Sequence, residues 1–255
     1  MHSANELLHF QNHIGAGKPN SMRDRTAACP FCDRKSLTGI LDECGPILHI
    51  KNKYPTLLDT TQTLIIETDD CEGNLSNYNE DHLYSLIDFT LRKWEEMMAG
   101  GEHESVILYK NHGPLSGGTI HHSHMQIVGL KKADYMNKIV PEYFAGPYAA
   151  KGEDVDFTIS DHPIMGFTEL NVILKDRVAV KKFSKYIQIA AHFILNHFHR
   201  GCSSFNLFFY KLDGNIICKA VPRFVDSPLF IGYSLSQVSN NLEDTAKRLQ
   251  SLYSF

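Results

Sequence analysis

Apolar residues along the chain form short runs typical of strands and one longer stretch in which they recur at helical spacing. The first half contains four runs, at 47–52 (ILHIKN), 63–68 (TLIIET), 105–111 (SVILYKN) and 119–130 (TIHHSHMQIVGL). Between the second and third runs, Leu83, Leu86 and Trp94 belong to a helical apolar period over residues 80–98. The predicted order is therefore strand, strand, helix, strand, loop and strand.

The second half repeats this order in outline. Its predicted elements are a strand, an amphipathic helix and a hairpin of two strands, at 166–174, 181–200, 203–212 and 215–224. Asp213-Gly214 predicts a tight turn in this hairpin, whereas a Gly-rich loop (HGPLSGG, 112–118) joins the last two strands of the first half. A site built on the first hairpin would thus have no copy in the second. A final helix is predicted within 236–255, with Asn240 or Asn241 near its start.

These elements indicate an α+β fold of two units, each a mainly antiparallel sheet with a packed helix. The start of the chain shows no sustained apolar period, and Pro and Gly residues punctuate the stretch between the units. The predicted boundaries are an irregular N-terminal arm at 1–28, a first unit at 29–130, a connection at 131–157 and a second unit at 158–255.

Composition narrows the class of partner. The 255 residues carry a formal charge of −4, and no run of Lys or Arg is longer than two residues, which argues against a nucleic-acid or anionic-membrane surface. No apolar stretch approaches the roughly 20 residues of a membrane span, and the N-terminus lacks the apolar core of a secretory signal. We therefore expect a cytoplasmic protein that acts on small molecules.

The richest chemistry lies in the stretch from Asn111 to Gln126. Side chains alternate along a strand, so His122, His124 and Gln126 are expected to share one face. Burying two imidazoles and an amide together is costly without partners, so this face calls for a ligand, a metal or a hydrogen-bond network. The preceding glycines would let backbone N–H groups approach phosphate oxygens closely.

This stretch resembles the galactose-1-phosphate uridylyltransferases, the transferase branch of the histidine triad superfamily. The match runs without a gap through Asn111, Gly113, Gly117, Thr119, His122, His124 and Gln126. It departs from the family pattern at Gly118, Thr119 and Ser123, where the family has Cys, Ser and Pro. The resemblance covers about residues 29–130. Because the branch also contains nucleoside-diphosphate-sugar and diadenosine tetraphosphate phosphorylases, the resemblance implies the type of reaction but not a single substrate. It implies two histidine-triad-like units, the second degenerate.

The resemblance also implies roles for individual residues. His124 would be the nucleophile that attacks the α-phosphorus of a nucleotide and forms a covalent histidine–nucleotide intermediate. Gln126 would hold phosphate oxygens, and because an amide delivers no proton, a phosphate-type leaving group is favoured. The remaining nucleotide contacts implied by the match are Asn111, Gly117, Gly118 and Thr119, with Asn52 and Tyr54 against the nucleoside. A turn that ends a strand is the alternative explanation for Asn52 and Tyr54.

A zinc site is implied as well. Cys29 and Cys32 have the two-residue spacing that presents two thiolates to a tetrahedral ion, although a redox pair has the same spacing. Alignment with the zinc-bearing members of the family adds Cys71 and His122, with Cys44 as a rival for the third position. The inferred Zn²⁺ site is structural and would brace the strand next to His124.

The sequence therefore predicts a nucleotidyltransferase or phosphorylase that acts on a nucleoside diphosphate sugar or a dinucleoside polyphosphate. The alternatives are a nucleotide hydrolase of the same superfamily and a non-catalytic, zinc-stabilised nucleotide-binding protein. The family carries an arginine-rich N-terminal strand, whereas this arm offers Lys18, Arg23 and Arg25. A homodimer is implied by the family alone.

Overall fold

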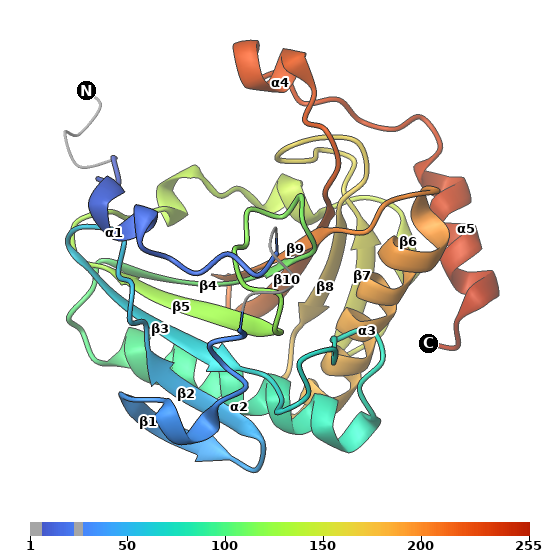
Figure 1. Cartoon of the computed structure of the whole chain (residues 1–255). Helices are drawn as coiled ribbons and strands as arrows, with labels where there is room; N and C mark the ends of the chain where they lie inside the picture. The colour runs from blue at the N-terminus through green and yellow to red at the C-terminus, as the bar shows by residue number, and fades with distance from the viewer. Residues whose placement is uncertain (1–6, 23–27) are drawn as a thin grey trace. The chain divides into compact units, whose positions relative to one another are not determined.

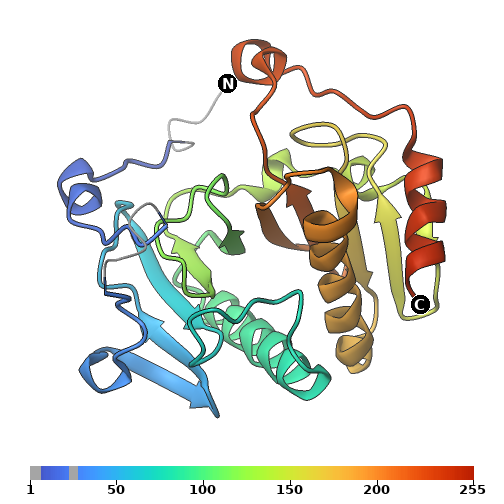
Figure 2. The same ribbon diagram turned by 45° about the vertical axis from the view of Figure 1, so that its right-hand side comes forward.

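The computed structural model describes residues 7–22 and 28–255, so Arg23 and Arg25 lie outside the described residues. The chain divides into two compact units, whose strands and helices appear in Figure 1 and, turned by 45°, in Figure 2. Unit 1 consists of Met1–Asn74 and Ser85–Lys138, and unit 2 of Leu75–Tyr84 and Ile139–Phe255. None of the helices in the described ranges has the length and apolar character needed to cross a membrane.

Unit 1 is built on an antiparallel sheet with the order β1-β2-β3-β5-β4. The strands are β1 (Ile40–Cys44), β2 (Ile47–Lys51), β3 (Thr60–Ile66), β4 (Ser105–His112) and β5 (His124–Leu130). The long helix α2 (Glu80–Ala99) crosses from unit 2 into unit 1. Short helices complete the unit, namely α1 (Asn12–Ala16), η1 (Arg34–Ser36) and η2 (Met136–Lys138).

Buried and partly exposed side chains alternate along β4, so one face of this sheet is buried. Val106, Leu108 and Lys110 are buried, while the residues between them are partly exposed. Helix α2 packs here, because Trp94 is fully buried and its indole N–H donates to the Val106 carbonyl over 2.9 Å. The opposite face carries Tyr109 and its cross-strand neighbour Gln126, both partly exposed.

In unit 2 the strands pair antiparallel in the order β9-β10-β8-β7-β6. Its strands are β6 (Tyr148–Ala150), β7 (Val155–Ile159), β8 (Leu170–Leu174), β9 (Phe205–Leu212) and β10 (Asn215–Pro222). Its helices are η3 (Pro141–Phe144), η4 (Arg177–Ala179), α3 (Val180–Phe193), the π-helix η5 (Ile194–Phe198), α4 (Pro228–Tyr233) and α5 (Leu242–Leu252). Asp213 and Gly214 both have positive φ, at 50° and 81°, as a tight two-residue hairpin turn requires.

The predicted fold class is confirmed: the chain is α+β, with two units, each of mainly antiparallel strands with a packed helix. Several local predictions were wrong. The strand predicted over 119–130 begins only at His124, and the helix predicted over 181–200 becomes a π-helix at Ile194. Helix α1 lies in the arm predicted to be irregular, β6 lies within the predicted connection, and β7 begins inside that connection and was not predicted.

The late start of β5 has a physical reason. The backbone just before β5 makes its hydrogen bonds to the N-terminal arm and not to a neighbouring strand. The His121 N–H donates to the Ser21 hydroxyl over 2.9 Å, and the Met22 N–H donates to the Thr119 carbonyl over 3.2 Å. These bonds tie the approach to β5 to the N-terminal arm instead of to β3.

Candidate functional site

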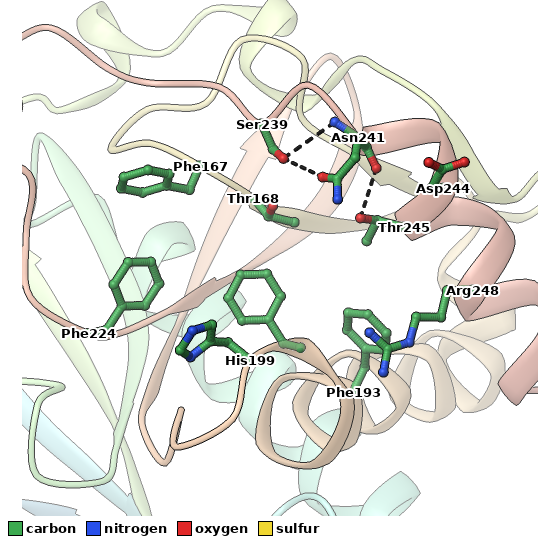
Figure 3. A pocket seen from close by; sticks show the side chains of 11 residues that line it. Phe167, Thr168, Phe193, His199, Phe224, Ser239, Asn241, Asp244, Thr245 and Arg248 are labelled. Atoms are coloured by element: carbon green, nitrogen blue, oxygen red, sulfur yellow. Dashed lines mark hydrogen bonds between the residues drawn. The ribbon is translucent and has the colours of Figure 1, made fainter.

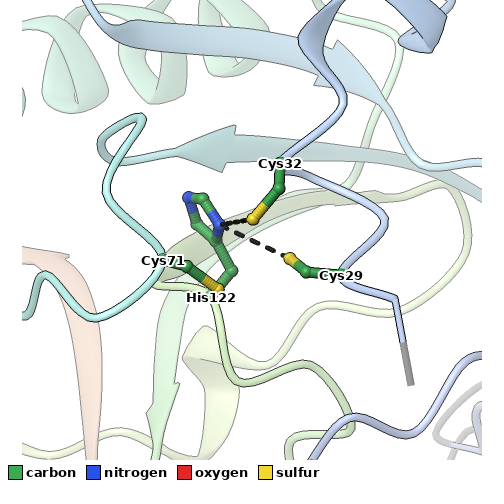
Figure 4. A group of neighbouring side chains, drawn as sticks. All are labelled: Cys29, Cys32, Cys71 and His122. Atoms are coloured by element: carbon green, nitrogen blue, oxygen red, sulfur yellow. Dashed lines mark hydrogen bonds between the residues drawn. The ribbon is translucent and has the colours of Figure 1, made fainter. Parts of the chain in front are cut away.

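Three cysteines and one histidine meet in unit 1. The ligand atoms of Cys29, Cys32, Cys71 and His122 all lie within 4.8 Å of one another. Figure 4 shows Cys29 and Cys32 on one loop facing the imidazole, with Cys71 arriving from a separate loop. Cys44, the rival for the third position, is not among the residues of this cluster.

The ring of His122 is oriented to offer one nitrogen to this cluster. Its Nε2 lies 2.8 Å from the carbonyl oxygen of Thr68, so Nε2–H donates there and Nδ1 keeps its lone pair. Nδ1 lies 3.5 Å from the sulfur of Cys29 and 3.6 Å from that of Cys32. In a tetrahedral zinc site a sulfur and a nitrogen ligand are about 3.6 Å apart. The residues therefore fit a tetrahedral metal ion.

The pKa of one thiol in the cluster also bears on metal binding. Burial, together with the neighbouring Cys32 and Cys29, raises the pKa of Cys71 to about 12. Without a cation the Cys71 thiol would stay protonated at neutral pH, so metal binding there would release a proton. The cluster can hold a metal ion, and its three sulfur donors and one imidazole are soft ligands that suit a transition metal.

A pocket of about 260 Å³ opens beside this cluster on the polar face of the sheet. We call it the unit 1 pocket. Eight of the predicted site residues line it, namely Asn52, Tyr54, Asn111, Gly117, Gly118, Thr119, His124 and Gln126. His122 is the exception to the predicted shared face: it precedes β5 and points to the cysteines instead. The His-x-His pair thus divides between the cluster and the pocket.

His124 lies at the base of the pocket and is 7% exposed. Its Nδ1 is 2.8 Å from the carbonyl oxygen of His122, which makes Nδ1 the N–H donor and leaves the Nε2 lone pair free for chemistry. Burial is the main cause that lowers the pKa of His124 to about 4, and the charges of Lys110 and Lys18 act in the same direction. The imidazole is therefore neutral, and a potential nucleophile, near pH 7.

The wall of the unit 1 pocket is positively charged, and sequence motifs did not predict this charge. Lys18, Lys51 and Lys53 line it, and no Asp or Glu does so among the residues that the structure describes. Burial lowers the pKa of Lys18. This unbalanced positive charge suits a ligand with several phosphate oxygens.

Apolar residues form the rest of the wall. Phe31, in the Cys-x-x-Cys loop, packs edge-on against His124, with ring centroids 5.4 Å apart. The sequence motif did not single out Phe31, although its position between the two cysteines places it at the pocket. The other apolar residues of the lining are Pro19, Pro30, Leu37, Ile50, Leu64 and Ile120.

Two glycines shape the loop that closes the pocket. Gly117 has a φ of +83°, a conformation that other residues adopt rarely. A Cβ on Gly118 would lie 3.1 Å from the Cβ of Asn111, so the bare backbone permits a close approach there. Asn52 shapes a second edge, because its Oδ1 accepts the backbone N–H of Tyr54 over 2.9 Å. Asn52 thus forms a turn, as the alternative explanation held, and also lines the pocket.

Comparison with known proteins places this arrangement in a family. The models named "Domain of unknown function (DUF4931) N-terminal domain" and its C-terminal counterpart match residues 10–133 and 136–254. A DUF4931 family protein from Bacillus cereus ATCC 10987 has 49% identity, covers 83% of this chain and 98% of its own, and superposes with a TM-score of 0.77.

More distant structures share the fold. An ADP-glucose phosphorylase from Arabidopsis thaliana, solved with bound ADP-glucose, is 15% identical, covers 94% of each chain and has a TM-score of 0.69. A uridylyltransferase is 12% identical, covers 88% of this chain and 91% of its own, and also has a TM-score of 0.69. These likenesses confirm the predicted resemblance to the uridylyltransferase-like branch at the level of the fold.

One curated protein matches only locally. A di-/tripeptide transporter from Lactobacillus helveticus is 27% identical over 89 residues, which is 35% of this chain and 18% of that protein. The chain thus spans less than a fifth of this relative's length. The family models and the Bacillus cereus structure, in contrast, extend over both units. The chain belongs to the DUF4931 family.

Proposed function

We propose that this protein is a nucleotidyltransferase or phosphorylase that uses His124 as its nucleophile. The observation that carries this proposal is a neutral, oriented imidazole at the base of a pocket lined by three lysines and, in the described residues, by no carboxylate. The proposed donor is a nucleoside diphosphate sugar or a dinucleoside polyphosphate. The fold shared with an ADP-glucose phosphorylase supports the first of these.

The proposed reaction has two steps. Nε2 of His124 attacks the α-phosphorus, a P–N bond forms, and the P–O bond to the leaving phosphate group breaks. The Nδ1–H bond to the His122 carbonyl supports the positive charge that develops on the ring. A phosphate oxygen of the acceptor then attacks the same phosphorus and frees the histidine.

The other pocket residues have supporting roles in this scheme. Gln126 and Asn111 offer amide donors to the non-bridging oxygens, and Thr119 offers its hydroxyl. Gln126 has no proton to deliver at pH 7, so the leaving group must depart as a phosphate anion, as both donor classes allow. Lys18 would offset the negative charge of the transferred phosphates.

We propose zinc as the ion of the four-residue cluster, with a structural role. Four protein ligands would close its coordination shell, so no open position remains for substrate. Because His122 is two residues from His124, the ion would fix the backbone whose carbonyl orients the nucleophile. Thiolate ligands also suit a reducing compartment such as the cytoplasm.

The test is intact-protein mass measurement at neutral pH after mixing with UDP-, ADP- and GDP-sugars and diadenosine polyphosphates. We expect an adduct of one nucleotide on the wild type and on the control His162→Ala, whose side chain is 69% exposed in unit 2, but not on His124→Ala. Handling stays neutral because acid hydrolyses a phosphoramidate. An adduct on His124→Ala, or none with any donor, would contradict the proposal.

Adding an acceptor separates transfer from hydrolysis. For a transferase or phosphorylase, the adduct should persist in buffer and disappear on addition of inorganic phosphate or a sugar phosphate. For a hydrolase, free nucleotide should accumulate at the same rate with and without these acceptors.

A further inference from the structure

Unit 2 contains a larger cavity that the proposed reaction does not use. Its volume is about 470 Å³, within the size range of small-molecule sites. Four phenylalanines line it, namely Phe167, Phe193, Phe198 and Phe224. Figure 3 shows Phe167 and Phe224 on one side, with Phe193 and Arg248 on the other. We call it the unit 2 cavity.

The wall facing these rings is polar. Ser239 and Asn241 precede helix α5, and Thr245 and Arg248 lie on it. The Ser239 hydroxyl donates to Oδ1 of Asn241, and the Thr245 hydroxyl donates to the Asn241 carbonyl over 3.1 Å. The amide nitrogen of Asn241 has no hydrogen-bond acceptor in the part of the chain that the structure describes, so it remains available as a donor. A ligand here would meet aromatic faces on one side and hydrogen-bonding groups on the other.

Arg248 gives the cavity a cation. Its guanidinium lies 5.9 Å from the ring centroid of Phe193, and no carboxylate lies within 4.0 Å of it in the described ranges. Asp244, one turn earlier on α5, is instead 3.9 Å from Lys247. Arg248 therefore keeps its N–H donors for an anion, and phosphate and carboxylate are the groups that guanidinium binds best.

The backbone around the cavity departs from regular structure in two places. Phe167 has a φ of 62°, which is rare for a bulky side chain. Helix α3 ends in the π-helix Ile194–Phe198, which delivers Phe198 and His199 to the cavity wall. Both features cost free energy locally and recur at ligand sites.

We infer that the unit 2 cavity binds a nucleoside monophosphate, with the base among the phenylalanines and the phosphate at Arg248. A purine or pyrimidine supplies the flat faces for stacking and the edge heteroatoms that the Asn241 amide can bond. The carboxylate of Asp244, on the same helix, would accept from ribose hydroxyls. This site is separate from the one that carries the proposed function, and neither depends on the other.

Calorimetric titration of the full chain with AMP and with UMP tests this inference. The unit 1 pocket also attracts anions, so the titrations use Lys51→Glu protein, in which a carboxylate replaces one of its lysines. Within this background we compare Arg248→Gln, Phe224→Leu and a matched control, Lys247→Gln. Lys247 neighbours Arg248 on α5, is 73% exposed and is not among the residues that line the cavity.

We expect AMP or UMP to bind, and Arg248→Gln to weaken that binding at least tenfold, the size of a lost charge-assisted hydrogen bond. Phe224→Leu, which keeps an apolar side chain but removes the ring, should weaken it about fivefold. Lys247→Gln should leave the affinity unchanged. Absence of binding by both nucleotides, or binding that neither cavity variant weakens, would overturn the inference.

Discussion

At the scale of single residues, two histidines with one residue between them donate through different ring nitrogens. His122 donates through Nε2 to Thr68 and turns Nδ1 to the cysteines. His124 donates through Nδ1 and leaves Nε2 for the pocket. The His-x-His motif predicted that both would be functional, but their separation depends on backbone carbonyls that no motif encodes. No motif places Lys18 at the site, because a lone lysine in an irregular arm belongs to no pattern.

Lys18 is expected to bind substrate phosphate. In Lys18→Gln protein we expect the KM for the nucleotide donor to rise about tenfold, because one charge-assisted contact is lost. The matched control is Lys35→Gln, an exposed lysine that is not among the residues lining the pocket. Steady-state kinetics at several donor concentrations would measure this. An equal KM in Lys18→Gln and wild type would remove Lys18 from the site.

His49 links stability to pH. Burial is the main cause that lowers its pKa to about 4, and Nε2 of His49 has no hydrogen-bond partner in the described structure. The unfolded chain takes up this proton near pH 6.5, whereas the folded protein resists it until about pH 4. The contribution of neutral His49 to the free energy of unfolding is therefore complete above pH 6.5 and is lost as the pH falls toward 4.

Urea unfolding between pH 4 and 7 measures this effect. We expect the free energy of unfolding to fall less steeply with decreasing pH in His49→Phe than in the wild type. The exposed His162, replaced in the same way, serves as the control and should follow the wild type. Parallel curves for His49→Phe and wild type would show that His49 has no part in the pH dependence.

At the scale of elements, strands and helices with strong patterns were predictable, and weakly patterned ones were not. Helix α2 and strands β2, β3, β4, β9 and β10 follow apolar runs or periods. Strand β1 was missed because its residues are mostly exposed and give no alternation, and β6 because it has three residues. The sequence did not predict the unit 2 cavity, because its phenylalanines are spread from Phe167 to Phe224 and form no motif.

The metal cluster joins elements that lie far apart in sequence. We expect Cys71→Ser protein to lose most of its bound zinc, while Cys44→Ser, outside the cluster, keeps the wild-type amount. Elemental analysis after dialysis gives the metal content. Equal zinc in both variants would show that Cys71 is not a ligand.

Removing the metal should loosen the elements that it connects. After chelation we expect faster amide hydrogen exchange in 28–39, 67–73 and 119–124, because these segments contain or adjoin the four ligands. Helix α3 in unit 2 should exchange as before. Unchanged exchange in all three segments would mean that the ion does not hold them in place.

At the scale of the whole molecule, the two units have similar strands and helices but differ in the loops that close their last hairpins. Unit 1 closes its last hairpin with the Gly-rich loop of the pocket, and unit 2 closes its own with Asp213-Gly214. The sequence alone predicted this difference, because both turns have distinctive compositions. A buried ion pair occurs in each unit, Lys110 with Glu67 and Lys219 with Glu169.

The pair in unit 2 is a strong test of core electrostatics. Glu169 also accepts hydrogen bonds from the backbone N–H groups of Ile164 and Met165, so its side chain is fixed in the core. We expect Lys219→Met to cost about 3–5 kcal/mol in the free energy of unfolding, because it leaves a buried charge without its partner. Lys247→Met, at a side chain that is 73% exposed on α5, should cost less than about 0.5 kcal/mol. Urea unfolding measures both, and similar losses would contradict this account.

The order of the cluster residues along the chain also bears on synthesis. Cys29 and His122 are 93 residues apart, so His122 leaves the ribosome about 5–20 s after the cysteine pair. During that interval the three thiols can meet a metal ion without the fourth ligand that would close the shell. Closing so long a loop is also a slow, non-local step in folding. We therefore expect the yield of correctly folded unit 1 in a growing cell to depend on how much free zinc the nascent chain encounters.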